Sequence, residues 1–198
     1  MKKLTILVTL LCVVLNGCII INQTTTLPPS PYVGTVPLSG DIIHTPDGDV
    51  IATIPQGWIL LDTQNKADQN TMLVLADTAY SGIIFFSKLP VTESTMADIR
   101  QGGLEVAARK SFQHLEEKTH GDAKLTTDYQ TFGVDDRAFC SYEYSNDHRR
   151  SVNRVVVFST GKQIYECVAV QLSTDGKAMM KFQDMCSAQQ SVVNTIRW

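Results

Sequence analysis

The chain has 198 residues, of which 43% are hydrophobic and 19% are charged. Its 17 basic and 20 acidic side chains give a formal net charge of −3 at neutral pH. This acidic balance argues against a nucleic-acid partner, because binding to phosphates needs clustered lysine and arginine. The hydrophobic fraction is ordinary for a globular protein, so most of the chain is expected to fold around a core.

The first 17 residues have the layout of a secretory signal. Lysines at positions 2 and 3 precede an apolar run that ends at Leu15. The stretch Leu15-Asn16-Gly17-Cys18 resembles the cleavage box of a bacterial lipoprotein, except that a small residue is usual where Asn16 stands. The resemblance implies cleavage after Gly17 and lipidation of Cys18, which becomes the new N-terminus.

A lipid anchor on Cys18 predicts attachment to a membrane. A diacylglyceryl group plus an N-linked acyl chain such as palmitate holds a protein stably, whereas one chain alone holds it only marginally. The next residue is Ile19 rather than the Asp that commonly retains lipoproteins at the inner membrane. We therefore expect a cell-envelope protein on the outer membrane, facing the periplasm. The alternative is an uncleaved helix over residues 4–21, about 18 residues long and near the lower limit for a membrane span.

Residues 18–40 are expected to form the lipidated N-terminus and a disordered tether. The segment from 22 to 40 is rich in Thr, Pro and Gly, and it lacks the periodicity of a helix or a strand. Residues 41–198 are then expected to form one folded domain.

Strand and helix patterns follow one another in that domain. Short β-like runs at 41–44 and 49–54 flank the turn Thr45-Pro46-Asp47-Gly48, and further strands are expected at 71–76 and 82–88. Apolar residues recur with helical spacing at 94–118, which predicts a helix. Strands at 124–132, 137–144, 151–159 and 163–171 follow, the last three as an antiparallel meander, and a helix at 175–197 ends the chain.

This order predicts an α+β domain built on an antiparallel β-sheet. Several strands are apolar on both sides, and in the last one three residues alternate with three others: Tyr165, Cys167 and Ala169 with Ile164, Val168 and Val170. Such a sheet needs cover on both faces, so we expect helices on both faces in a three-layer sandwich.

The stretch Ile54-Pro55-Gln56-Gly57-Trp58 after the first hairpin, together with this order of elements, resembles the PsbP-like sandwich. That family includes the extrinsic photosystem II protein and bacterial lipoproteins of the DcrB type. The resemblance covers residues 41–198. It implies the fold and a non-catalytic accessory role in the envelope, and it transfers no active site.

Three cysteines remain in the domain, and export places them where disulfides persist. Cys167 lies four residues before the end of its strand, and Cys186 lies about eleven residues into the final helix, so both thiols reach a similar level if the two elements fold back on each other. Cys140 lies two strands away, beyond disulfide range. A Cys167–Cys186 disulfide with Cys140 free is therefore expected, and three reduced thiols are the alternative.

The remaining sequence signals for chemistry are weak. His44 precedes a turn that holds Asp47 and Asp49, but turn aspartates usually cap their own backbone, so neither a metal nor a cofactor is expected. Residues 148–150 and Arg154 form a basic cluster that reads as a solvated turn. We therefore expect a non-enzymatic, membrane-tethered binding or accessory domain of unidentified ligand, with an envelope protein as a possible partner. The alternative is a small hydrolase or thiol redox protein that uses Cys140 or a histidine.

Overall fold

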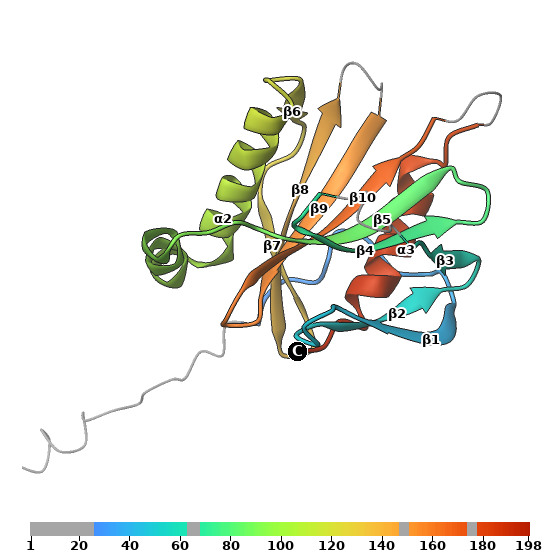
Figure 1. Ribbon diagram of the computed structural model, residues 1–198, viewed down its shortest axis with the longest axis horizontal. Helices are drawn as coiled ribbons and strands as arrows, with labels where there is room; N and C mark the ends of the chain where they lie inside the picture. Colours follow the sequence, from blue (N-terminus) through green and yellow to red (C-terminus); the bar gives the residue numbers. More distant parts are fainter. Residues whose placement is uncertain (1–25, 63–67, 147–150, 174–177) are drawn as a thin grey trace, which may run out of the picture.

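The computed structural model describes residues 26–62, 68–146, 151–173 and 178–198. Within these residues the protein has three layers (Figure 1). Helix α2 (Glu93–Lys118) covers one face of an antiparallel sheet, and helix α3 (Phe182–Val193) covers the other together with a two-stranded hairpin. The predicted α+β sandwich with helices on both faces of the sheet is confirmed.

The hairpin and the main sheet contain all the named strands of the described residues. The hairpin pairs β1 (Leu38–His44) with β2 (Ile51–Pro55). The main sheet contains β3 (Trp58–Leu60), β4 (Thr71–Asp77), β5 (Gly82–Lys88), β6 (Ala123–Leu125), β7 (Gln130–Val134), β8 (Arg137–Asn146), β9 (Ser151–Ser159) and β10 (Ile164–Gln171). Their order is β3-β4-β5-β10-β9-β8-β6, and β7 also pairs with β8. The expected meander of the last three strands is confirmed.

The strand expected at 124–132 is two strands that pair with different parts of β8. β6 pairs with the end of β8 and β7 with its beginning. Between them the Thr127 hydroxyl accepts a 3.0 Å hydrogen bond from the backbone N–H of Glu143. In a continuous strand, a backbone carbonyl would accept this bond. The side chain thus replaces one rung of the ladder and divides the strand.

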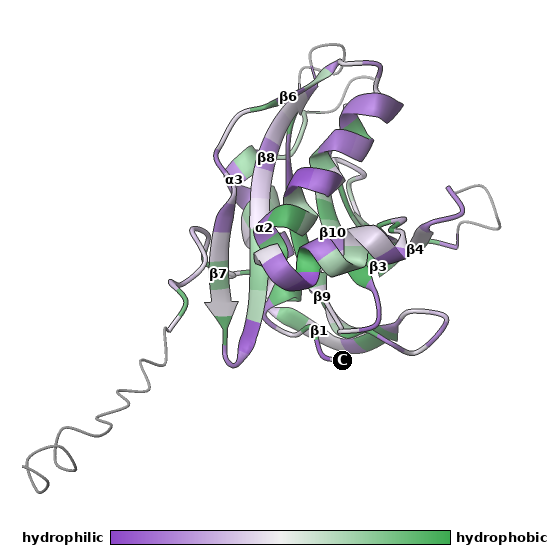
Figure 2. Cartoon of the chain, turned by 90° about the vertical axis from the view of Figure 1, so that its left-hand side faces the viewer, coloured by the Kyte–Doolittle hydropathy of each residue, from purple (hydrophilic) through white to green (hydrophobic). Residues whose placement is uncertain are grey.

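Each face of the sheet has its own hydrophobic cluster. On β10, Cys167 and Ala169 contribute to the cluster under α3, whereas Ile164 and Val168 contribute to the cluster under α2. Figure 2 shows the resulting colours, with hydrophilic residues along the outer side of α2 and hydrophobic stretches in the strands behind it. The two-sided apolar pattern of the sequence is therefore explained by cover on both faces.

Helix α2 has the predicted bounds to within one residue but is broken inside, whereas α3 is shorter than the predicted 175–197 at both ends, since residues 178–181 are not helical. α2 starts after Thr92, whose hydroxyl accepts the Thr95 N–H, and it breaks at Gly103, where φ is 75°. α3 ends at Val193 instead of reaching 197, because Arg197 leaves the helix to pair with the backbone of Ile51. Neither helix of the described residues is long and apolar enough to cross a membrane.

The ordered domain begins earlier than the predicted residue 41. Residues 26–37 run along α3 and β7, and β1 already starts at Leu38. The backbone N–H of Thr35 donates to Ser187 Oγ at 3.0 Å, and that of Val36 donates to Ser191 Oγ at 3.1 Å. The tether expected for 18–40 was therefore wrong for residues 26–40, because hydroxyls one helical turn apart on α3 hold this segment.

Candidate functional site

A cavity of about 240 Å³ lies between the C-terminal half of α2 and the sheet. Its wall is largely apolar and comes from α2, β5, β8, β9 and β10: Phe85, Leu115, Tyr144, Val155 and Val168. Small-molecule sites are typically concave and mostly apolar, with a few polar groups that fix the ligand. The polar groups of this cavity therefore decide what it can do.

Glu166 supplies the carboxyl group of the cavity. It lies on β10 between Ile164 and Val168 of the same face, directly opposite Ser87 on β5. Ser87 Oγ donates a 2.8 Å hydrogen bond to Glu166 Oε2. Burial raises the pKa of the Glu166 carboxyl, and hydrogen bonds from Ser111 and Ser87 partly oppose the rise. Among the described residues no ion pair joins this carboxyl to a cation.

Helix α2 adds a hydroxyl and an imidazole to the same cavity. Ser111 Oγ lies 2.6 Å from Tyr142 Oη, so these hydroxyls bond to each other. His114, almost one turn further along α2, also lines the cavity, and its buried Nε2 atom has no hydrogen-bond partner. A buried polar atom without a partner costs free energy unless a ligand or water satisfies it. His114 thus brings a ring nitrogen without a protein partner to the lining of the cavity.

Two lysines at the cavity already have carboxylate partners. Lys88 Nζ lies 2.6 Å from Asp47 Oδ2, and Lys118 forms an ion pair with Asp68. Both lysines and Asp68 line the cavity. The lysines of the wall are therefore already in ion pairs, whereas Glu166 forms no ion pair among the described residues.

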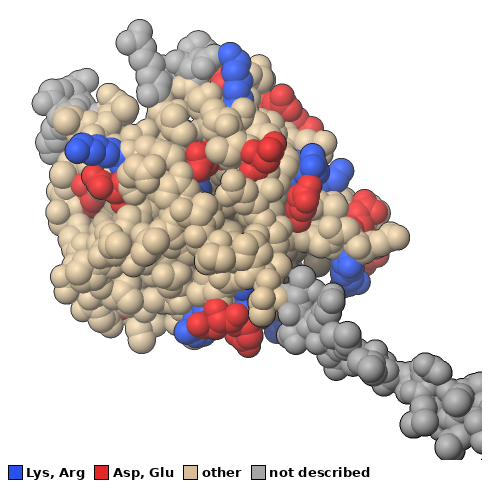
Figure 3. All heavy atoms as spheres, turned by 180° about the vertical axis from the view of Figure 1, so that it is seen from behind, with Lys and Arg blue, Asp and Glu red and all other residues tan. Residues whose placement is uncertain are grey.

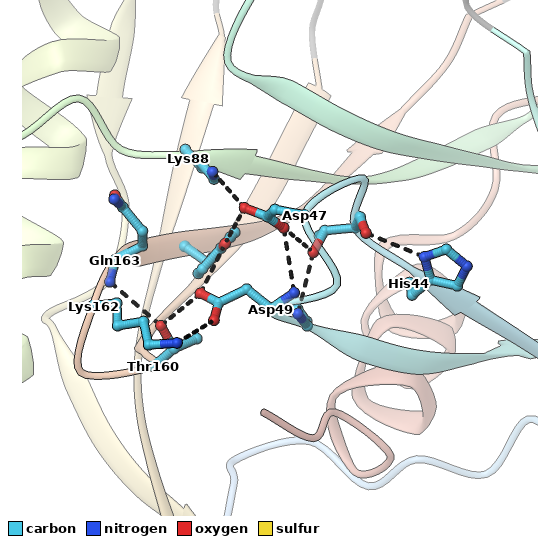
Figure 4. Close-up of polar contacts among 10 residues, drawn as sticks. His44, Asp47, Asp49, Lys88, Thr160, Lys162 and Gln163 are labelled. Carbon is cyan, nitrogen blue, oxygen red and sulfur yellow. Dashed lines mark hydrogen bonds and ion pairs between the residues drawn. The ribbon is translucent and has the colours of Figure 1, made fainter.

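The aspartates of the turn after His44 bind other side chains of the protein, as Figure 4 shows. Asp47 accepts hydrogen bonds from Lys88 and Thr45, and Asp49 accepts them from Thr160 and Tyr165. A ring nitrogen of His44 lies 3.2 Å from the carbonyl oxygen of Thr45. In the described part of the chain, no group of three or more histidine, cysteine or acidic residues is arranged to hold a metal. The turn fastens the hairpin to β5 and β10.

Cys140 lies in the hydrophobic cluster under α2 and is fully buried. Burial raises the pKa of its thiol, so the reactive thiolate is disfavoured. The residue does not line the cavity that contains His114 and Glu166. This environment does not fit a catalytic or redox cysteine.

Cys167 and Cys186 lie on the opposite side of the sheet, on β10 and α3. Both are buried free thiols, so the predicted disulfide is not formed in the structure. Gln189 donates to the carbonyl oxygen of Cys167 at 2.7 Å and hydrogen-bonds its thiol, whereas the Cys186 thiol is next to Tyr32. The two thiols therefore have different neighbours, and burial raises the pKa of each to about 12.

Arg154 was wrongly predicted to lie in a solvated turn. It is not in a solvated turn but 0% exposed, under α3 and residues 29–34. Its Nη1 and Nη2 each donate to Gln190 Oε1 at 3.1 Å, and Nη2 also donates to Ser30 Oγ at 3.3 Å. Its Nε has no hydrogen-bond partner. The guanidinium is held by neutral groups and aromatic rings rather than by a carboxylate.

Glu166 and Arg154 share a sequence signal that could have been used. Each is a charged residue inside a strand whose neighbours two positions away, on the same face, are apolar: Val152 and Val156 for Arg154, and Ile164 and Val168 for Glu166. Charged residues in such a position are uncommon without a partner or a role. Figure 3 shows acidic and basic side chains interspersed over one face of the surface. Arg154 and Glu166 themselves lie under α3 and under α2. The predicted processing residues, Gly17 and Cys18, lie outside the described residues, as does His148.

No protein-family model matches this chain, and a search of curated proteins finds no matching sequence. Among solved structures, the chain is similar to cyanobacterial PsbP from Synechocystis sp. PCC 6803, with 16% identity, a TM-score of 0.48, and coverage of 86% of this chain and 98% of that chain. The Ran-binding protein Mog1p of Saccharomyces cerevisiae gives 12% identity, a TM-score of 0.47, and coverage of 81% and 95%. A protein of Bacteroides thetaiotaomicron gives 14% identity and a TM-score of 0.41. That match covers 80% of this chain but only 48% of the Bacteroides chain.

Proposed function

We propose that this protein is a membrane-tethered binding domain of the cell envelope, and that it binds a small ligand in the cavity under α2. The observation that carries the proposal is the pairing of an apolar wall with two polar groups that lack full partners, Glu166 and His114 Nε2. Such a combination is typical of a ligand site.

Binding is favoured over catalysis by the partners of the two cavity serines. Ser87 donates to Glu166, and Ser111 bonds to Tyr142, while His114 Nε2 bonds to neither. A nucleophilic serine needs an adjacent base that takes its proton. The described residues therefore offer no assembled serine–histidine pair, and the proposed role is non-enzymatic.

The tether in this proposal is the lipid on Cys18 after cleavage behind Gly17, with the domain on the outer membrane and facing the periplasm. Incorporation of labelled palmitate into the wild type, and its loss together with loss of processing in Cys18→Ala, tests this part. Equal labelling of both proteins would contradict it. Crosslinking in intact cells tests separately for a protein partner in the envelope.

Ligand binding is tested by nuclear magnetic resonance on isotope-labelled protein titrated with a library of small molecules. The expected result is a set of ligands that shift the methyl signals of Leu115, Val155 and Val168, which line the cavity. The methyl signals of Val192 and Val193, which are buried on the α3 side, serve as the control. Shifts confined to the control methyls, or no ligand at all, would contradict the proposed site.

A further inference from the structure

We infer that the ligand of the cavity under α2 carries a protonated amine, placed against Glu166, and a compact apolar body. This inference rests on the proposed binding function and specifies the chemistry of the ligand. Three observations support it: the polar groups of Glu166 and His114, which we call the floor of the cavity, the apolar wall, and the pairing of both cavity lysines with aspartates.

The charge of Glu166 is the first argument. A buried carboxylate is costly unless a cation or several hydrogen bonds compensate it. Ser87 gives it a hydrogen bond of 2.8 Å and Ser111 gives it another, but neither brings a positive charge. The two lysines of the cavity are paired with Asp47 and Asp68 instead. A cation brought by a ligand would supply the missing partner.

The hydrogen-bonding capacity of the floor is the second argument. An ammonium group has three donors and no acceptor. The two oxygens of Glu166 retain acceptor capacity beyond the bonds from Ser87 and Ser111, and a neutral imidazole with its proton on Nδ1 offers Nε2 of His114 as a further acceptor. One ammonium group can therefore satisfy both residues at once, which a carboxylate ligand could not.

The wall limits the rest of the ligand. Phe85, Leu115, Val155 and Val168 present apolar surface, and the volume of about 240 Å³ suits a body the size of a single ring or a short alkyl chain. The paired lysines and aspartates carry compensating charges, so they do not select an anionic ligand. Small primary amines with one apolar group match these conditions.

The test compares benzylamine, benzyl alcohol and benzoate on the wild-type protein by methyl-detected resonance titration. Benzylamine is expected to bind roughly tenfold or more tightly than benzyl alcohol, because a charge-assisted hydrogen bond contributes more than a neutral one. Benzoate is expected to bind more weakly than benzyl alcohol. This comparison needs no mutation, so it does not depend on how any variant folds.

Two variants sharpen the test. Glu166→Gln is expected to weaken the binding of benzylamine roughly tenfold and to leave the affinity for benzyl alcohol unchanged. Glu105→Gln removes the same charge from the exposed side of α2, where Glu105 pairs with Arg109, and is expected to change neither affinity. Equal binding of amine and alcohol, or preference for benzoate, would overturn the amine inference but keep the binding function. Absence of binding by any probe and by the wider library would overturn both.

Discussion

The guanidinium carbon of Arg154 lies 4.7 Å from the centroid of the Tyr32 ring. The Tyr32 hydroxyl in turn donates a 2.6 Å hydrogen bond to Glu143 Oε1. Tyr32, from the N-terminal segment, thus covers the buried Arg154 with its ring and binds the Glu143 carboxylate with its hydroxyl. Cation–π contacts of this kind gain strength where water is excluded. The segment therefore belongs to the folded domain and contributes to its stability.

Replacement of Tyr32 by Ala should lower the free energy of unfolding by about 2 kcal/mol, because the aromatic cover of Arg154 and the bond to Glu143 are both lost. Val33→Ala is the control, since the neighbouring Val33 side chain is 74% exposed. Urea unfolding measures both variants. Equal midpoints for the two would contradict the structural role of the segment.

Gly34 is placed so close to α3 that it has no room for a side chain. A Cβ atom built there would lie 2.6 Å from the backbone nitrogen of Ser191. Because backbone cannot move aside as a side-chain end can, Gly34→Ala should displace the segment and cost about 1–3 kcal/mol. Hydrogen exchange of the Val36 amide, which donates to Ser191 Oγ, should accelerate in this variant and not in Val33→Ala. Unchanged exchange would show that the segment tolerates the added methyl group.

Glu166 should make the stability of the protein depend on pH. Its pKa is raised by burial, so its contribution is fully present below the unfolded pKa and is lost as pH rises through the folded pKa. Glu166→Gln stays neutral, and its melting temperature should exceed that of the wild type by a few degrees near pH 8 and match it near pH 4, where the unfolded carboxyl titrates. Glu105→Gln is the control and should show no such pH-dependent gain. A constant difference at all pH values would contradict the assigned environment.

The three domain cysteines should remain reduced and unreactive in the folded protein. Their thiols are buried, and burial raises the pKa of each, so little thiolate is available. In a version that starts at residue 22, a thiol reagent should label none of them under native conditions. After unfolding without reductant it should label three. One labelled thiol would instead indicate the disulfide between Cys167 and Cys186.

The sequence predicted elements well where a local pattern alone determines them. β5 and β9 have the predicted limits, and α2 starts within one residue of its prediction, because turn residues bound the strands and the helical period is clear. The final helix was predicted too long, since Ile196 continues the apolar spacing although it lies beyond the helix in the core. The next residue, Arg197, pairs with Ile51 of β2, and no local pattern reveals this long-range contact.

The candidate site was not predicted because it depends on which elements cover the strands. Glu166 interrupts an apolar face of β10, but only the position of α2 turns that interruption into the floor of a cavity. Arg154 has the sequence context of a solvated turn, but residues 29–34 cover it in the fold. The same segment has the composition of a linker, and its order comes from hydroxyls on α3 that lie far away in the sequence.

The docking of residues 26–37 on α3 and β7 also limits the distance between Cys18 and the folded domain. Only eight residues lead from Cys18 to residue 26. Even a fully extended chain of that length spans at most about 29 Å. With the proposed lipid on Cys18, this short connection would hold the edge of the domain near β7 close to the bilayer. Under that proposal, any partner in the envelope would have to meet the domain near the membrane surface.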